Sequence, residues 1–193
     1  MREITTKSEQ EKKRRRNQFI VGFILVAVML FSTLGYAFKS DESTDTTGNA
    51  QTITYNGFTF TNQNNLWFLT LGSSQFSFTN NPKEVQQINS NLNTSLSTYS
   101  GKPLYISSED KVAEVEIYRN LDQLVLRRQY ACLNNTKCDE NFPIKTCNDN
   151  FIIIQNSSSR NITQENNCVF IRGPQKNLTE ITDSFLFKTI GIN

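Results

Sequence analysis

The stretch ITYNGFTFTNQNNLWFLTLGSSQFSFT, residues 53–79, decides the fold of this chain. Large apolar side chains alternate with Thr, Ser and Gln along most of it, which is the period of strands with one buried face. Asn56-Gly57, between the first two apolar runs, is typical of a two-residue hairpin turn. The runs LWFLTL and QFSFT follow after short polar turns. We therefore expect a β-meander, with Trp67 in its core rather than exposed as a platform for sugars.

Towards the C-terminus, shorter apolar runs alternate with helix signals. We expect a short helix from Asn81-Pro82 to about Ile88, then a polar loop at 89–101 and a strand at 104–106. A helix near 109–121, capped by Ser108, should follow with Ala113, Ile117 and Leu121 facing inward. After it we expect a strand at 124–131, a hairpin of strands 151–155 and 168–172, and a last helix capped by Thr182 or Asp183 that ends at Gly191. The predicted fold class is α+β, with an N-terminal transmembrane helix, a flexible stalk, and then a mostly antiparallel sheet domain with two to three helices.

Towards the N-terminus, residues 19–38 read FIVGFILVAVMLFSTLGYAF and contain no charged side chain. At about 1.5 Å per residue, a helix of this length covers the roughly 30 Å hydrocarbon core of a bilayer. Twelve of the twenty residues are Leu, Ile, Val or Phe, and the stretch lacks the polar stripe of an amphipathic helix in a protein core. Residues 19–38 are therefore predicted to span a membrane, with the lipid bilayer as their partner.

Positive charge is concentrated on one side of this stretch. Seven Lys and Arg residues precede it, five of them in the run KKRRR at 12–16. Because basic flanks stay in the cytoplasm, we expect a single-pass protein of the cell membrane with a cytoplasmic N-terminus and an extracytoplasmic C-terminal domain. The alternative is a signal peptide cleaved after Ala37, but the apolar region is longer than such peptides have.

These features divide the chain into four segments. They are a cytoplasmic basic tail at 1–18, a transmembrane helix at 19–38, a disordered linker at 39–52 and an extracytoplasmic α+β domain at 53–193. The linker, KSDESTDTTGNAQT, is polar and has no large apolar side chain, which is typical of a flexible stalk. Residues 39–193 carry thirteen basic and fifteen acidic side chains, so charge gives no support to a nucleic-acid partner.

The chain contains no histidine. This excludes Ser-His-Asp and Cys-His catalysis, as well as metal and haem sites that need a His ligand. Phosphate loops, dinucleotide-binding glycine patterns and calcium loops are also missing from the sequence. We therefore predict no catalytic, cofactor-binding or metal-binding residues and no cofactor. Whether the protein is an enzyme stays open, with a protein that is not an enzyme as the leading interpretation.

Four cysteines, Cys132, Cys138, Cys147 and Cys168, lie in the predicted outer domain. An even number in an oxidising compartment predicts two disulfides. Zinc is the alternative, but the spacing contains no C-x-x-C pair. If strands 151–155 and 168–172 form a hairpin, Cys168 lies within reach of Cys147, which leaves Cys132 to pair with Cys138.

Other candidate sites are weaker. Arg127 and Arg128 are a candidate anion clamp, and the adjacent acids Glu109-Asp110 and Asp139-Glu140 are candidate cation ligands, although we expect all of them to be solvated or ion-paired. N-x-S/T sequons, which are candidate glycosylation sites, occur at Asn93, Asn134, Asn156, Asn161 and Asn177. Chance alone accounts for about this number in a chain so rich in Asn, Ser and Thr.

A resemblance involves the C-terminal hundred residues or so. The ordering Ala131-Cys132, Cys138-Asp139-Glu140, Phe142-Pro143-Ile144-Lys145-Thr146-Cys147, Asn167-Cys168-Val169-Phe170-Ile171, Phe185-Leu186-Phe187-Lys188 and Gly191-Ile192 resembles uncharacterised single-pass membrane-anchored proteins of small-genome (DPANN-type) archaea. The anchor and stalk are similar too. The resemblance implies an archaeal cell-surface setting and implies no activity or active site.

Three functions fit these observations. The first is a membrane-anchored extracytoplasmic protein without catalytic activity that binds an envelope protein or is a structural component of the envelope. The second is a membrane-tethered hydrolase of surface glycan, which would need two carboxylates facing each other across a cleft. The third is a minor pilin-like subunit, which would need a continuous helix from residue 19 to beyond residue 50.

Overall fold

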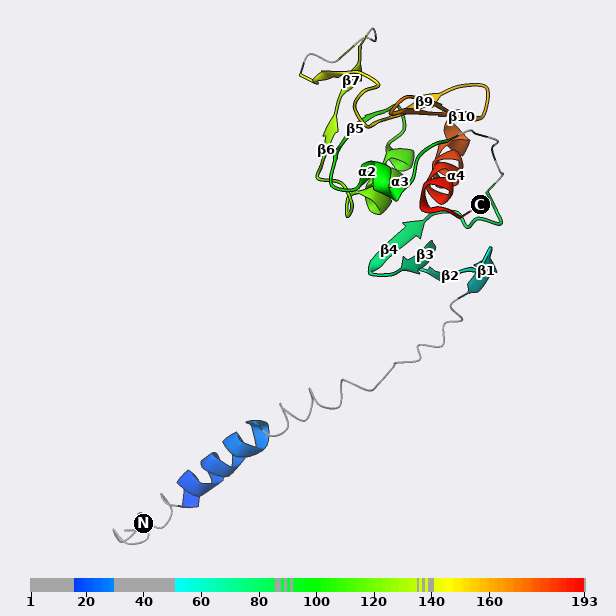
Figure 1. Cartoon of the computed structure of the whole chain (residues 1–193). Helices are drawn as coiled ribbons and strands as arrows, with labels where there is room; N and C mark the ends of the chain where they lie inside the picture. The colour runs from blue at the N-terminus through cyan, green and yellow to red at the C-terminus, as the bar shows by residue number, and fades with distance from the viewer. Residues whose placement is uncertain are drawn as a thin grey trace, which may run out of the picture. The chain divides into compact units, whose positions relative to one another are not determined.

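The computed structural model of the chain describes residues 16–29, 51–85, 88, 90, 92–134, 136, 138 and 141–192 (Figure 1). The chain divides into two units, Met1–Gly48 and Asn49–Asn193. The second unit, called the domain from here on, is an α+β fold.

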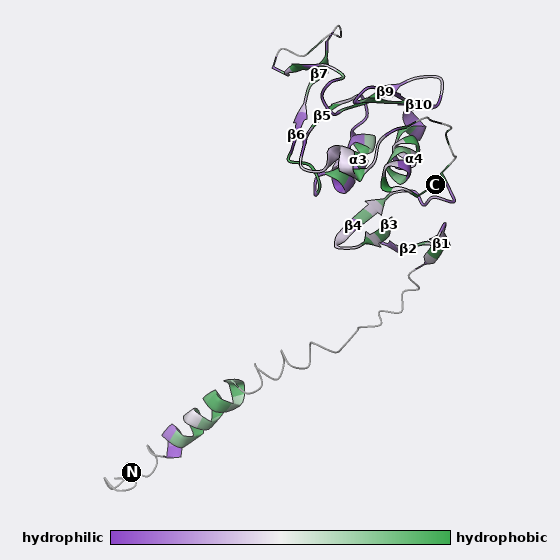
Figure 2. Ribbon diagram, in the orientation of Figure 1, coloured by the Kyte–Doolittle hydropathy of each residue, from purple (hydrophilic) through white to green (hydrophobic). Residues whose placement is uncertain are grey.

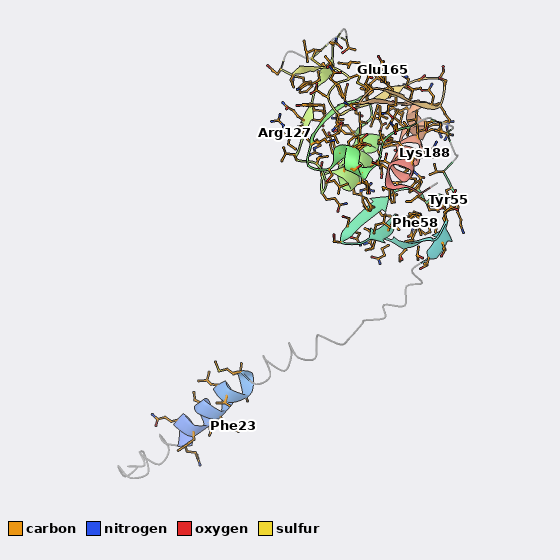
Figure 3. The ribbon with its side chains drawn as sticks, in the orientation of Figure 1. Phe23, Tyr55, Phe58, Arg127, Glu165 and Lys188 are labelled. Atoms are coloured by element: carbon orange, nitrogen blue, oxygen red, sulfur yellow. A yellow bond between two sulfur atoms is a disulfide. The ribbon has the colours of Figure 1, made fainter. Side chains whose placement is uncertain are left out.

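In the first unit, residues 16–29 form a helix. Its apolar side chains are exposed, with Phe19 at 78% and Phe23 at 77% of full exposure. Figure 2 colours most of this helix as hydrophobic, and Figure 3 labels Phe23 on it. Among the described residues, no helix is both long enough and apolar enough to cross a bilayer. Residues 30–38 of the predicted transmembrane helix and 39–50 of the predicted linker lie outside the described residues, so both predictions stay untested.

The first sheet of the domain is the antiparallel meander expected from residues 53–79. Its strands, in spatial and chain order, are β1 (Thr52–Tyr55), β2 (Phe58–Gln63), β3 (Leu66–Leu71) and β4 (Ser74–Phe78). Asn56 (φ 46°) and Gly57 (φ 83°) form the β1–β2 turn, which needs two left-handed residues because only this turn matches the strand twist. Trp67 is buried at 4% exposure, as expected for a core residue.

The second sheet is mixed. The prediction of a mostly antiparallel sheet is therefore wrong for this half of the domain. Its strands lie in the order β10-β11-β9-β5-β6. The pairs β11–β9, β9–β5 and β5–β6 are parallel, and only β10–β11 is antiparallel. The strands are β5 (Pro103–Ser108), β6 (Arg127–Tyr130), β9 (Phe151–Asn156), β10 (Asn161–Glu165) and β11 (Cys168–Gly173).

The predicted hairpin of strands 151–155 and 168–172 is also wrong. These segments are β9 and β11, which are neighbours but run parallel. The chain reverses through β10, which pairs with β11 across a tight turn at Asn166 (φ 51°). Sequence reasoning missed β10 because Ile162 is its only large apolar residue and is buried at 2% exposure, whereas its neighbours are polar.

The helices are α2 (Leu96–Tyr99), α3 (Lys111–Leu121) and α4 (Leu178–Ile190), with a 3₁₀ turn at Gln175–Asn177 before α4. The predicted loop at 89–101 thus contains a short helix. Asp110, not Ser108, caps α3, since its Oδ1 accepts from the backbone N of Ala113 at 2.7 Å. Residues 82–84 form a turn instead of the predicted helix, and residues 86, 87 and 89 lie outside the described part.

Helices α3 and α4 lie between the two sheets. Helix α3 contacts β4 and β5, and α4 contacts α3, β10 and β11 (Figure 1). Phe187 of α4 packs against Phe78 of β4 and Phe60 of β2, with ring centroids 4.6 and 6.0 Å apart. Residues on all sides of α4 are buried, which is typical of a helix in the middle of a core.

Candidate interaction face

The two disulfides join Cys132 to Cys138 and Cys147 to Cys168, the pairing expected from the sequence. The geometric reason for the second bond differs from the expected hairpin. Cys168 begins β11 beside Phe151 of the parallel strand β9, and the backbone N of Asn167 donates to the carbonyl of Cys147 at 2.9 Å. Residues 131–150, which we call the cysteine loop, are thereby fastened to the second sheet.

Exposed apolar side chains gather on three neighbouring elements of the domain. In the described part of the domain, six large apolar side chains are exposed, and all of them lie on α3, next to or within β6, or in the cysteine loop. They are Val112, Val115, Leu126, Tyr130, Phe142 and Ile144. The rings of Tyr130 and Phe142 are 5.6 Å apart, so β6 and the cysteine loop are in contact there. We call the surface of α3, β6 and the cysteine loop the β6 flank.

A polar cluster holds α3 against β6 in this flank. Glu114 of α3 is almost fully buried and accepts hydrogen bonds from the hydroxyls of Tyr118 and Tyr130. Lys111 donates to Glu114 Oε2 at 3.1 Å and to Tyr130 Oη at 3.0 Å. Burial, followed by the hydrogen bond with Glu114, raises the pKa of Tyr118, so this tyrosine remains a neutral donor. The cluster therefore holds β6 in place against α3.

The two arginines of β6 point to opposite faces of the sheet. Arg128 lies over the ring of Tyr118, 3.5 Å from its centroid, and forms an ion pair with Asp122 at 3.3 Å. Arg127 is on the other face, where its Nη2 lies 3.5 Å from the hydroxyl of Tyr105, and Figure 3 labels it at the margin of the domain. Hydrogen bonds from Lys145 and then Arg127 lower the pKa of Tyr105.

Strand β6 is an edge strand. In the part of the chain that the structure describes, it pairs with β5 on one side and with no strand on the other. All four of its residues, Arg127–Tyr130, are exposed. An edge of this kind presents unpaired backbone N–H and C=O groups to which a further strand can pair.

A second feature, in the core, is a pair of acids. Glu116 of α3 and Asp183 of α4 are both fully buried. Glu116 accepts from Thr79 Oγ1 at 2.5 Å and lies 3.4 Å from Arg119 Nη1. Asp183 Oδ2 accepts from the backbone N and the Nδ2 of Asn80, both at 2.9 Å, but its buried Oδ1 has no donor. Burial, and then the charge of Glu116, raise the pKa of Asp183 well above its usual value.

These observations place a proton on the acid pair. The charge of Glu116 contributes to the raised pKa of Asp183, and a protonated carboxyl group can donate a hydrogen bond to a neighbouring carboxylate. Paired carboxyl groups also perform glycoside hydrolysis. However, neither acid is exposed, so this pair is not the open pair that the predicted hydrolase needs. The predicted helix cap at Thr182 or Asp183 is also wrong, because α4 begins at Leu178 and both residues lie inside it.

A small cavity of about 230 Å³ lies between Tyr55 of β1, Val85, and Phe187 and Lys188 of α4; Figure 3 labels Tyr55 and Lys188. Lys188 Nζ donates to the carbonyl of Ile88 at 2.6 Å, and burial lowers the pKa of this lysine. Pockets for drug-sized ligands measure roughly 300–1,000 Å³. The cavity is smaller than that, and its lysine already has a partner.

The predicted cation ligands have structural roles where they are described. Glu109 Oε2 accepts from the backbone N of Asn156 at 2.8 Å, and Asp110 caps α3 and accepts from Gln175. Asp139 and Glu140 lie outside the described residues. Within the described ranges, no three His, Cys, Asp or Glu side chains come close enough to hold a metal ion.

The sequons differ in exposure. Asn93, Asn134 and Asn156 are exposed, whereas Asn161 and Asn177 are half-buried. The Nδ2 atoms of the last two donate to Ser159 Oγ at 3.3 Å and to Glu180 Oε2 at 3.1 Å. Because glycans attach at Nδ2, the exposed three are better placed for modification.

Comparison of the chain with protein-family models, with curated proteins and with solved structures found no match in any of the three. The β6 flank therefore has to be interpreted from its own geometry. The run RRQY at 127–130 contains the edge, but sequence reasoning could not identify it as one because an edge depends on the order of strands. The acid pair was missed because its members come from two helices that meet only in the folded domain.

Proposed function

We propose that this chain is a single-pass membrane protein whose extracytoplasmic domain binds an envelope protein through the β6 flank, without catalysing a reaction. The observation that carries the proposal is the concentration of exposed apolar residues on the flank, beside the unpaired edge of β6. Apolar patches rimmed by polar residues are typical of protein–protein interfaces, and Tyr and Arg are the residue types that contribute most at such interfaces.

Location in the membrane is part of the proposal. It is supported by the uncharged stretch at 19–38, by the basic residues that precede it and by the exposed apolar side chains of helix 16–29. Two disulfides, Cys132–Cys138 and Cys147–Cys168, are typical of a domain outside the cytoplasm. Orientation with the N-terminus inside then places the flank on the outer side of the membrane.

Site-specific photo-crosslinking in native membranes tests this function. A benzophenone side chain is placed at Leu126 or Ile144, which are 70% and 68% exposed on the flank. The control position is Thr59, which is exposed on the outer, Thr-rich face of the first sheet. We expect a discrete crosslinked product from both flank positions and none from Thr59. Equal products from all three positions, or none from the flank, would contradict the proposal.

A further inference from the structure

We propose that β6 binds an extended, acidic segment of a partner protein as an added strand of the second sheet. The inference rests on the proposed docking role of the β6 flank and names the kind of partner that it takes. It follows from the backbone groups of the edge, from the charges beside it, and from the cost of pairing two copies of this edge.

The backbone of β6 is ready to pair. The N–H of Ala131, directly after β6, donates inward, to the carbonyl of Ile106 at 3.1 Å. Because backbone groups of successive strand residues face opposite sides, those of Gln129 and Arg127 also face β5, and those of Arg128 and Tyr130 face the free edge. Extended peptides bind such edges through main-chain hydrogen bonds, and alternate side chains give specificity. The cluster around Glu114 holds β6 in place, so β6 loses little conformational entropy when a partner binds.

The side chains beside the edge are basic. Arg127 and Lys102 lie on or next to the strand pair at this edge, and neither forms an ion pair with a carboxylate in the described part of the chain. A third cation, Lys145, lies 4.2 Å from the ring centroid of Tyr105 but is already paired with Asp149 at 3.4 Å, so Arg127 and Lys102 are the cations available to a partner. An incoming strand with acidic residues at alternate positions would place carboxylates next to these cations. Complementary charge of this kind selects the partner and speeds association.

A second copy of the chain does not fit this edge. Two β6 strands paired edge to edge would bring Arg127 and Arg128 of one copy against the same arginines of the other. Like charges opposite each other destabilise strand pairing, and charged side chains are a device by which proteins prevent edge-to-edge self-association. The same arginines that oppose a second copy attract an acidic strand.

The test uses the full chain in detergent and synthetic peptides of about eight residues, long enough to cover a strand. The probe peptide alternates Glu and Thr, and a second peptide alternates Lys and Thr. A third has the Glu-Thr sequence with alternate backbone amides methylated, which removes hydrogen-bond donors without changing charge. Binding is measured by fluorescence anisotropy, and hydrogen exchange follows the free-edge amides of Arg128 and Tyr130. We expect the first peptide to bind at least about tenfold more tightly than the other two and to slow exchange of both amides.

Variants of the edge separate backbone pairing from charge. Arg128→Pro removes an N–H that faces away from β5, a position where proline is tolerated, and should abolish binding of the Glu-Thr peptide. Arg128→Ala also removes the side chain but keeps that N–H, and should still bind the peptide. Arg127→Glu should weaken binding of the Glu-Thr peptide about tenfold. Circular dichroism shows whether each variant is folded.

Several results would overturn the inference. They are equal binding of the methylated peptide, equal binding of the Lys-Thr peptide, or unchanged binding by Arg128→Pro. A dimer in analytical ultracentrifugation that Arg128→Pro dissociates would assign the edge to a second copy instead. If crosslinks form at Leu126 while the Glu-Thr peptide fails to bind, the acidic strand is wrong and the docking function stands. If no flank position crosslinks, the docking function itself fails.

Discussion

Asp183 and Glu116 are buried side by side, and this pair makes the stability of the domain depend on pH. Since the pKa of Asp183 is raised in the folded state, its protonated form is the one that the fold favours. The stabilisation is fully present below the unfolded pKa of about 4. It is lost as pH rises through the higher folded value.

We predict that Asp183→Asn stabilises the domain at pH 8. An Asn side chain keeps the acceptor for Asn80 and supplies a permanent donor to Glu116, without a buried charge. The gain should be measurable at pH 8 and smaller at pH 5, because the raised pKa of Asp183 makes its buried charge costly only at the higher pH. Thermal unfolding followed by fluorescence of Trp67, the single tryptophan, measures it.

Asp122→Asn is the matched control, because Asp122 is 45% exposed and pairs with Arg128 at the surface. Its effect should be small at both pH values, as is typical of exposed ion pairs. An equal change by Asp183→Asn at pH 5 and pH 8, or a loss of stability at pH 8, would show that the pair does not hold a shared proton.

Single residues were predicted correctly where a local pattern decides their position. Trp67 is buried within an alternating strand, and Asn56-Gly57 forms a turn that few other dipeptides adopt. Asp183 was interpreted as a cap because Asp is common at helix starts. Its actual position inside α4 depends on Asn80, a residue that is distant in sequence, and no local pattern contains that information.

At the scale of elements, the two disulfides differ in the length of chain that they close. Cys147–Cys168 spans 21 residues and Cys132–Cys138 spans 6. Chain-entropy arguments give about 3 kcal/mol for the longer loop and about 2 kcal/mol for the shorter. Cys168 is also fully buried beside Phe151 and Ile153. We therefore predict that Cys147→Ala/Cys168→Ala lowers the free energy of unfolding more than Cys132→Ala/Cys138→Ala does. Urea denaturation measures both, and the reverse order would refute the prediction.

Gly173 is the point where β11 and α4 are closest. A Cβ at this position would lie 2.1 Å from Cδ1 of Ile181. We predict that Gly173→Ala costs about 1–3 kcal/mol, as overpacking does. Adding Ile181→Val removes the clashing methyl group, so the double variant should be less destabilised than the sum of the single changes. Strict additivity in urea denaturation would argue against this contact.

Helices and strands with a regular pattern of apolar residues were predicted correctly, and those without one were missed in whole or in part. The four strands of the first sheet follow directly from alternation, and α3 follows from the stripe of Ala113, Ile117 and Leu121, all fully buried. Strand β10 and the start of α4 were not found. Strand β10 has a single large apolar residue, Ile162, so its sequence shows no alternating pattern. Helix α4 is buried on all sides, so it has no polar face that would mark where it begins.

At the scale of the whole molecule, the proposed topology predicts a result in intact cells. Protease added outside should remove the domain and leave an N-terminal tag on the cytoplasmic side intact, because the basic run at 12–16 keeps that end inside. Immunoblots against both ends measure this, with lysed cells as the control in which both are digested. A domain that survives until lysis would contradict the topology.

The order of strands in the second sheet could not be predicted from the sequence, because it depends on the packing of the whole domain. Parallel strands such as β5, β9 and β11 are buried on both faces, so their apolar runs resemble one another. The candidate site depends on that order, because β6 is an edge only when β5 lies between it and β9. The disulfide pairing was correct although the hairpin was not, since β9 and β11 are neighbours in either direction.

The middle position of α4 has a consequence for biogenesis. Both sheets bury apolar side chains against its thirteen residues, yet every strand of the domain is synthesised before it. A nascent chain that ends at Gly173 would have only α3 between the two sheets, and an incomplete core. Under the proposed topology, the core of the domain closes only when this last helix has followed the strands to the far side of the membrane.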